Sequence, residues 1–301
     1  GSPMFKFGPL PETALFSVDF EQSGFSRQWL DWMEANCLGY GRVYPESGYT
    51  LGGPEDTDVD LRKKGRLFPF EVVNWKNGRP IVDLTRFNQS YWENVARVIR
   101  ECADRGIVLQ MQLYQRFYFQ NPRNDQLESG ATVPRLHRWM VNYFNPLNNI
   151  NKYEVPEGRG GYGIFRAMTD DTVWGELHRQ WVGHILKAIG GNGNVVIDLM
   201  NEGSFASGGL TREWVEMTLD MIEKWELEQG VRILTGFDFD HLVKKEDPNL
   251  NYILSHPRME LIIGEGSEGH IVPDLVAGTR EPKSESLALL FRRKYGKPVI
   301  S

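Results

Sequence analysis

The sequence predicts an α/β protein built as a (β/α)₈ barrel that is incomplete at its C-terminal end. Segments of helical periodicity alternate with short apolar runs, which is typical of a parallel sheet covered by helices. Links from helix to strand are short, whereas long segments follow the expected strands at 40–44 and 107–114, and barrels gather long loops at one end. A doubly wound open sheet would alternate similarly, but residues 14–25 lack its glycine-rich phosphate turn.

Individual elements follow from capping residues and apolar spacing. Helices are expected over roughly 26–37, 90–102, 174–189, 211–225 and 286–295. Strands are expected at about 14–19, 40–44, 107–114, 194–201, 231–237, 251–255 and 297–301. The seven strands leave no residues for an eighth, and residues 1–301 are interpreted as one domain, with Gly1–Pro3 as a cloning remnant.

Composition excludes several classes of function. The formal net charge is −6 and forms no basic stripe, so nucleic acid is not expected as a partner. No apolar run approaches the roughly 18 residues of a membrane span, and no signal peptide is visible, which leaves a secreted or a cytoplasmic location open. Cys37 and Cys102 are expected to be small buried groups, and no cofactor or metal motif occurs.

The stretch NVVIDLMNEGSF, residues 194–205, is the most informative for chemistry. It reads as a buried strand that delivers Asn201 and Glu202 to its carboxyl end, facing the long loops. A partly desolvated carboxyl there can hold a proton near neutral pH and protonate a leaving oxygen. The alternative is that Glu202 caps a helix or pairs with an arginine.

Several stretches together resemble the retaining glycoside hydrolases of the large (β/α)₈ clan that includes cellulases, mannanases and β-galactosidases. DLMNEGSF resembles the strand that carries the acid/base. YGRVYPESGY resembles the second strand, whose arginine, here Arg42, supports the catalytic carboxylates. VDLTRFNQSYW, with the helix and strand after it, resembles the second βα unit of cellulase-like members. YILSHP resembles the sixth strand of the clan, and KPVIS resembles the seventh.

The resemblance implies hydrolysis of β-linked sugars with retention, with Glu202 as general acid/base, Asn201 on the substrate's 2-hydroxyl and no cofactor. If KPVIS is the seventh strand, the nucleophile is expected after Ser301. A rival nucleophile is Glu265 in MELIIGEGSEGH, but only Pro257 and Arg258 separate that run from YILSH, too few for a parallel crossover. An unclosed barrel also predicts a further segment or a second chain that completes the sheet.

Aromatic and polar residues of the long segments are candidates for binding an oligo- or polysaccharide. These candidates are Trp75, Tyr114 and Trp139, together with His256 at an expected strand tip. The competing interpretation is that the aromatic rings form small cores that hold the loops in place. A carbohydrate-binding or scaffolding barrel without activity is the alternative function.

Overall fold

A parallel sheet forms the centre of the computed structural model, which describes residues 14–17, 19–21, 24–45, 66–76, 78–119, 139, 142–157, 161–201, 203, 205, 209–239, 248–264 and 294–300. Six strands pair in the order β1-β4-β5-β6-β7-β8, and every neighbouring pair is parallel. Their bounds are β1 Tyr40–Val43, β4 Val108–Gln112, β5 Val195–Asp198, β6 Leu234–Phe239, β7 Leu261–Gly264 and β8 Val299–Ile300. Within the described residues the sheet is open, with β1 and β8 at its edges.

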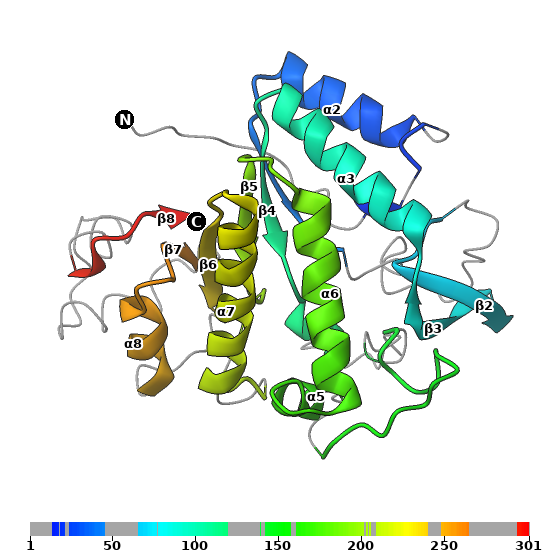
Figure 1. The fold of residues 1–301 in the computed structure, drawn as a ribbon. Coiled ribbons are helices and arrows are strands. Elements are labelled where there is room, and N and C mark those ends of the chain that lie inside the picture. Colours follow the sequence, from blue (N-terminus) through cyan, green and yellow to red (C-terminus); the bar gives the residue numbers. More distant parts are fainter. Residues whose placement is uncertain are drawn as a thin grey trace, which may run out of the picture.

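Helices lie between successive strands of the six-stranded sheet from β1 to β7. The described helices are α1 Ala14–Ser17, α2 Phe25–Ala35, α3 Gln89–Asp104, α5 Gly163–Ala167, α6 Val173–Ile189, α7 Arg212–Gln229 and α8 Pro248–Ser255. The three long helices α3, α6 and α7 lie side by side along the sheet (Figure 1). Among the described residues, no helix is both long and apolar enough to cross a lipid bilayer.

The capping residues explain where the long helices begin. The side chain of Asn88 accepts a hydrogen bond from Ser90 N before α3, Thr172 accepts one from Gly175 N before α6, and Thr211 accepts one from Trp214 N before α7. Each of these bonds satisfies one main-chain donor of the first helical turn. The predicted start at Thr211 is therefore confirmed by its cap geometry.

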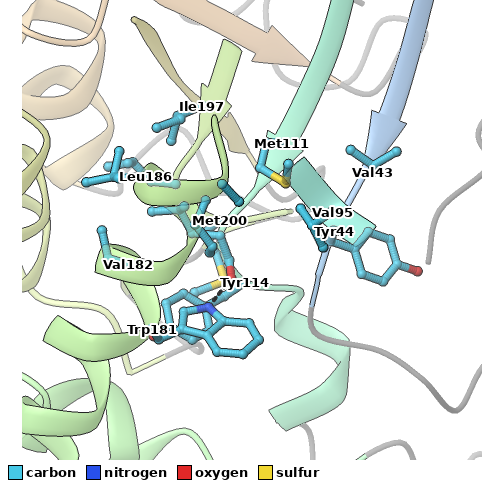
Figure 2. Packing of buried hydrophobic residues seen from close by; sticks show 14 of the residues in the cluster. Val43, Tyr44, Val95, Met111, Tyr114, Trp181, Val182, Leu186, Ile197 and Met200 are labelled. Atoms are coloured by element: carbon cyan, nitrogen blue, oxygen red, sulfur yellow. Dashed lines mark hydrogen bonds between the residues drawn. The ribbon is translucent and has the colours of Figure 1, made fainter. Parts of the chain in front are cut away.

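The apolar core lies between the sheet and these helices. Val43, Met111 and Ile197 are in register on three neighbouring strands and are fully buried. Figure 2 shows them with Val182 and Leu186 of α6. Because side chains alternate between the two faces of a strand, the residues between these apolar positions point to the opposite face of the sheet.

Two expected strands are helices in the structure. Residues 14–17 form α1, and residues 251–255 belong to α8. The apolar run at 261–264 is strand β7 instead, parallel to β6. Short apolar runs suit buried helices as well as strands, which explains both errors. The helix expected at 286–295 lies mostly outside the described residues, and Cys37 is exposed although Cys102 is buried as expected.

The long segments after β1 and β4 carry structure of their own. The first contains an antiparallel hairpin, β2 Phe70–Lys76 and β3 Arg79–Phe87. The second contains a 3₁₀ turn, Arg116–Phe119, and α5. The two segments meet where Ile150 N donates to Val82 O at 2.9 Å and Val82 N donates to Asn148 O at 3.0 Å. The predicted placement of long loops after these strands is thus confirmed.

Candidate functional site

A buried polar cluster occupies the sheet face opposite the apolar core, at the carboxyl ends of the strands. We call it the strand-end cluster, and it consists of Arg42, Gln110, Gln112, Gln115, Asp198, Asn201 and Asp238. Register explains part of it, because Arg42 pairs with Gln110 and Gln112 pairs with Asp198 on adjacent strands. Side chains at paired positions of a parallel sheet point to the same face.

Asp198, the last residue of β5, is the anchor of the strand-end cluster. Its Oδ2 accepts hydrogen bonds from Gln110 Nε2 at 2.9 Å and Gln112 Nε2 at 3.1 Å. Its Oδ1 accepts from the main-chain nitrogens of Met200 at 3.3 Å and Asp238 at 3.1 Å. Complete burial raises the pKa of Asp198 to about 6, and these hydrogen bonds to its carboxylate lower the pKa in part.

Asn201 is held at both ends of its side-chain amide. Its Oδ1 accepts from Gln112 Nε2 at 2.6 Å and from Arg42 Nη1 at 3.3 Å, and its Nδ2 donates to Gln115 Oε1 at 2.8 Å. Arginine has only donors, so Arg42 identifies the atom that faces it as the amide oxygen. The orientation of the Asn201 amide is therefore determined by its neighbours.

The main chain on each side of position 202 is fixed as well. Asn201 N donates to Tyr114 O at 2.9 Å, next to β4, and Gly203 N donates to Asp238 O at 2.8 Å, in β6. A Cβ atom at position 203 would clash with the ring of Phe237, so this close approach requires glycine. Glu202 itself lies outside the described residues, but both of its neighbours are anchored to the strands that flank β5.

Arg42 brings a positive charge to the strand-end cluster. Its Nη1 lies 3.9 Å from Oδ2 of Asp238, whose side chain is fully buried on β6. The guanidinium thus stands between this carboxylate and the amide of Asn201, which it also contacts.

The structure revises the argument against Glu265. Glu265 lies outside the described residues, but it follows β7 directly in sequence. Because residues 251–255 form part of α8, the chain crosses from β6 to β7 through a helix, and the steric objection to a parallel strand at 261–264 is removed. Counted from β5, β7 is the second strand and β8, formed by part of KPVIS, is the third.

The side chain of Tyr114, a predicted substrate-binding residue, packs among aromatic and histidine rings of α5, α6 and α7. It is fully buried, and its hydroxyl lies 2.8 Å from His178 Nδ1 on α6. His178 Nε2 lies 3.0 Å from Thr218 Oγ1, which donates onward to Trp214 O, so Nε2 is the donor and Nδ1 accepts from Tyr114. Burial lowers the pKa of His178 to about 3, which keeps the ring neutral.

The two predicted binding tryptophans pack against loop residues. Trp139 is 7% exposed and stacks on Phe119 at a centroid distance of 6.0 Å. Trp75, on β2, is half-buried and meets the ring of Phe68 edge-on at 5.8 Å. These contacts favour the interpretation of the aromatic residues as small cores within the long loops, with part of Trp75 still accessible.

His256 is not at a strand tip, because the strand expected there is α8. It follows α8 on the connection that leads into the start of β7. Its Nε2 lies 3.0 Å from Glu216 Oε1 on α7, and its Nδ1 accepts from Arg258 N at 3.2 Å. Nε2 thus links the end of α8 to α7, Nδ1 is used within its own turn, and a role in substrate binding is not supported.

Asp198, Gln110, Gln112 and Asp238 were not identified from the sequence. The sequence does contain a pattern that indicates a polar face. IVLQMQLY places Gln110 and Gln112 at alternate positions, and VVIDLM places Asp198 as a single polar residue in an otherwise apolar strand. Buried polar side chains need partners, so such positions indicate a polar face. Among the described residues, no group of three histidine, cysteine, aspartate or glutamate side chains is arranged to hold a metal ion.

Comparison with known proteins identifies a family. The family model described as "Domain of unknown function (DUF6298)" matches residues 75–245, more than half of the chain. The chain therefore belongs to this family. A comparison with curated proteins gave no match.

Solved structures that are similar to this chain include glycoside hydrolases. A Bacteroides vulgatus protein provisionally assigned as a glycoside hydrolase matches with a TM-score of 0.51 and 14% identity over 99% of this chain. This chain spans 44% of the length of that protein. The endo-1,4-β-mannanase of Rhizomucor miehei matches with a TM-score of 0.50 and 12% identity, over 99% of this chain and 77% of the enzyme. At these identities the likeness shows the fold alone, a parallel α/β sheet of the (β/α)₈ type.

Proposed function

We propose that this member of the DUF6298 family is a retaining glycoside hydrolase that acts on β-linked sugars, with Glu202 as its general acid/base. The observation that supports this most directly concerns the residues on either side of position 202. Asn201 N donates to Tyr114 O, just after β4, and Gly203 N donates to Asp238 O in β6, at the carboxyl ends of a parallel sheet. In barrel enzymes, catalytic residues come from these strand ends.

The second carboxylate in our proposal follows β7 or β8. Glu265 comes directly after β7, and β7 is separated from β5 by β6 alone. Two strand spacings correspond to about 10 Å between backbones, from which inward side chains can reach the roughly 5 Å carboxyl separation of retaining enzymes. A carboxylate after β8 is the alternative that the resemblance of KPVIS to the seventh strand implies.

The proposed mechanism uses the two carboxyls in turn. Glu202 donates its proton to the leaving glycosidic oxygen while the second carboxylate attacks the anomeric carbon and forms a glycosyl ester. Glu202 then removes a proton from water, which attacks the anomeric carbon from the face that the leaving group vacated and releases the second carboxylate. Asn201 binds the 2-hydroxyl of the sugar in this proposal, and Arg42 supports the acidic side chains through its charge.

Aryl β-glycosides with poor and good leaving groups test the role of Glu202. We expect Glu202→Gln to lose about 10²–10⁴-fold in kcat/KM on a poor leaving group, which needs protonation, and much less on dinitrophenyl glycosides. Azide should restore turnover of dinitrophenyl substrates and yield the β-glycosyl azide. The matched control is Glu213→Gln, a substitution in the first turn of α7. Wild-type activity in Glu202→Gln on every substrate would remove Glu202 from the mechanism.

Covalent trapping identifies the nucleophile. A 2-deoxy-2-fluoro glycosyl donor should leave one glycosyl group on the protein, and peptide mass spectrometry should locate it on Glu265 if β7 supplies the nucleophile. Glu265→Gln should then abolish labelling, whereas Glu268→Gln, in the same segment, should retain it. Labelling that persists in Glu265→Gln would assign the nucleophile elsewhere. Sugar binding without any turnover would favour the alternative of a carbohydrate-binding barrel.

A further inference from the structure

Gln112 has an unusual hydrogen-bonding arrangement. Its Nε2 lies 3.1 Å from Asp198 Oδ2 and 2.6 Å from Asn201 Oδ1, so both amide hydrogens are used. Its Oε1 is buried and accepts no hydrogen bond from any residue that the structure describes. A buried acceptor without a partner destabilises the folded protein. Such an exception needs a compensating reason.

Rotating the Gln112 amide by half a turn would be worse. Oε1 would then face two acceptors, the Asp198 carboxylate and the Asn201 oxygen, and repulsion would replace two hydrogen bonds. The alternative of reversing Asn201 as well is blocked by Arg42, whose guanidinium has no acceptor to offer to Nδ2. Asp198 thus fixes Gln112, and Gln112 together with Arg42 fixes Asn201.

Gln110 offers a natural comparison on the same strand and the same face. Its Nε2 also donates to Asp198 Oδ2, at 2.9 Å, and its Oε1 accepts from the Tyr40 hydroxyl. Both ends of this amide are satisfied, and no hydrogen bond joins Gln110 to Asn201. Gln110 therefore shares the stabilising contact with Asp198 that Gln112 makes, but lacks its link to Asn201.

We propose that Gln112 is a positioning residue that turns the Asn201 amide so that Nδ2 is presented for recognition of a sugar 2-hydroxyl. This inference rests on the proposed function. Asp198 acts through Gln112 as the fixed end of the chain of hydrogen bonds, and Gln115 marks the direction of Nδ2 at 2.8 Å. In this proposal Gln112 affects specificity for sugars with a 2-hydroxyl without touching the sugar, because it orients Asn201, the residue that contacts the hydroxyl.

The paired variants Gln112→Met and Gln110→Met test this directly. Each removes one amide donor from Asp198 at similar side-chain volume, but only Gln112→Met also removes a hydrogen bond to Asn201. We measure kcat/KM for an aryl β-glycoside and for its 2-deoxy analogue. The preference for the 2-hydroxyl substrate should fall by about tenfold in Gln112→Met and stay within about twofold of wild type in Gln110→Met. An equal fall in both variants would overturn the proposal.

A second measurement separates this inference from the proposed function. In protein labelled with ¹⁵N-asparagine, the side-chain NH₂ signals of Asn201, assigned by their loss in Asn201→Ser, should shift in Gln112→Met and not in Gln110→Met. This result needs no turnover. An inactive wild type would refute the proposed hydrolase activity. The positioning role of Gln112 would still be tested by these signals, and equal shifts in both variants would refute that role.

Discussion

Amide side chains serve opposite purposes in two regions of this protein. In the loop of residues 142–151, asparagine side chains bond almost entirely to the main chain. In the strand-end cluster, glutamine and asparagine side chains bond to one another and to Asp198. The first arrangement replaces the hydrogen bonds that regular secondary structure would supply, whereas the second fixes the direction of side chains. The partner of an amide, more than its burial, indicates which role it has.

Asn149 illustrates the first role. Its Nδ2 donates to Tyr143 O and to Asn145 O, both at 2.9 Å, and its Oδ1 accepts from Lys152 N at 2.7 Å. Neighbouring asparagines act similarly, and Asn142 Nδ2 donates to Tyr118 O at 3.0 Å. These bonds hold a segment without regular helix or strand against the rest of the protein.

The largest effect should come from removing the anchor of the strand-end cluster. Asp198→Ala leaves two glutamine donors and two main-chain donors unpaired in a buried site, and should lower the free energy of unfolding by about 4 kcal/mol. Urea denaturation measures this loss. Asp104→Ala, at an exposed position in the last turn of α3, is the control. A loss below about 1 kcal/mol would show that the cluster does not depend on Asp198.

The next effect concerns pH. The folded-state pKa of Asp198 is raised to about 6 by burial, above the value of about 3.9 expected in the unfolded chain. The part of the stability that comes from this raised pKa is therefore fully present below pH 4 and is lost as pH rises through 6. Across this window, wild type should lose about 3 kcal/mol relative to Asp198→Asn, which does not titrate. Parallel stability curves for the two proteins between pH 4 and 7 would contradict this expectation.

Removing an asparagine side chain from the loop of residues 142–151 should lower the free energy of unfolding by less than Asp198→Ala does, without affecting substrate preference. Asn149→Ala should cost about 2 kcal/mol in unfolding free energy, because it removes bonds to three main-chain groups. The preference for a 2-hydroxyl substrate should not change. Leu147→Ala, at an exposed position in the same loop, should stay within about 0.5 kcal/mol of wild type. A changed preference in Asn149→Ala would mean that the two regions are not separate in function.

The smallest effect should come from Tyr114→Phe. It removes the hydroxyl that donates to His178 Nδ1 and should cost about 1 kcal/mol, with KM for any glycoside unchanged. Thermal unfolding and substrate titration together measure this. A raised KM at unchanged stability would restore the predicted role of Tyr114 in substrate binding.

Much of the fold could be predicted from the sequence, because long periodic helices such as α6 and α7 carry their own caps. The run YILSH could not be assigned correctly, since five residues of mixed apolar character suit either state. That single error had consequences, because it also made Glu265 look sterically excluded. Burial of Tyr114 and Trp139 could not be predicted either, since composition does not distinguish a ring that faces a sugar from one that faces another ring.

The tight contact between Gly203 and Phe237 also bears on how freely the sequence around Glu202 can vary. Any side chain at 203 would push the segment away from β6 and move both residues before it. In a library randomised at 203, selected for activity, glycine should be recovered almost alone unless position 237 is randomised too. Smaller residues at 237 would then appear together with alanine or serine at 203.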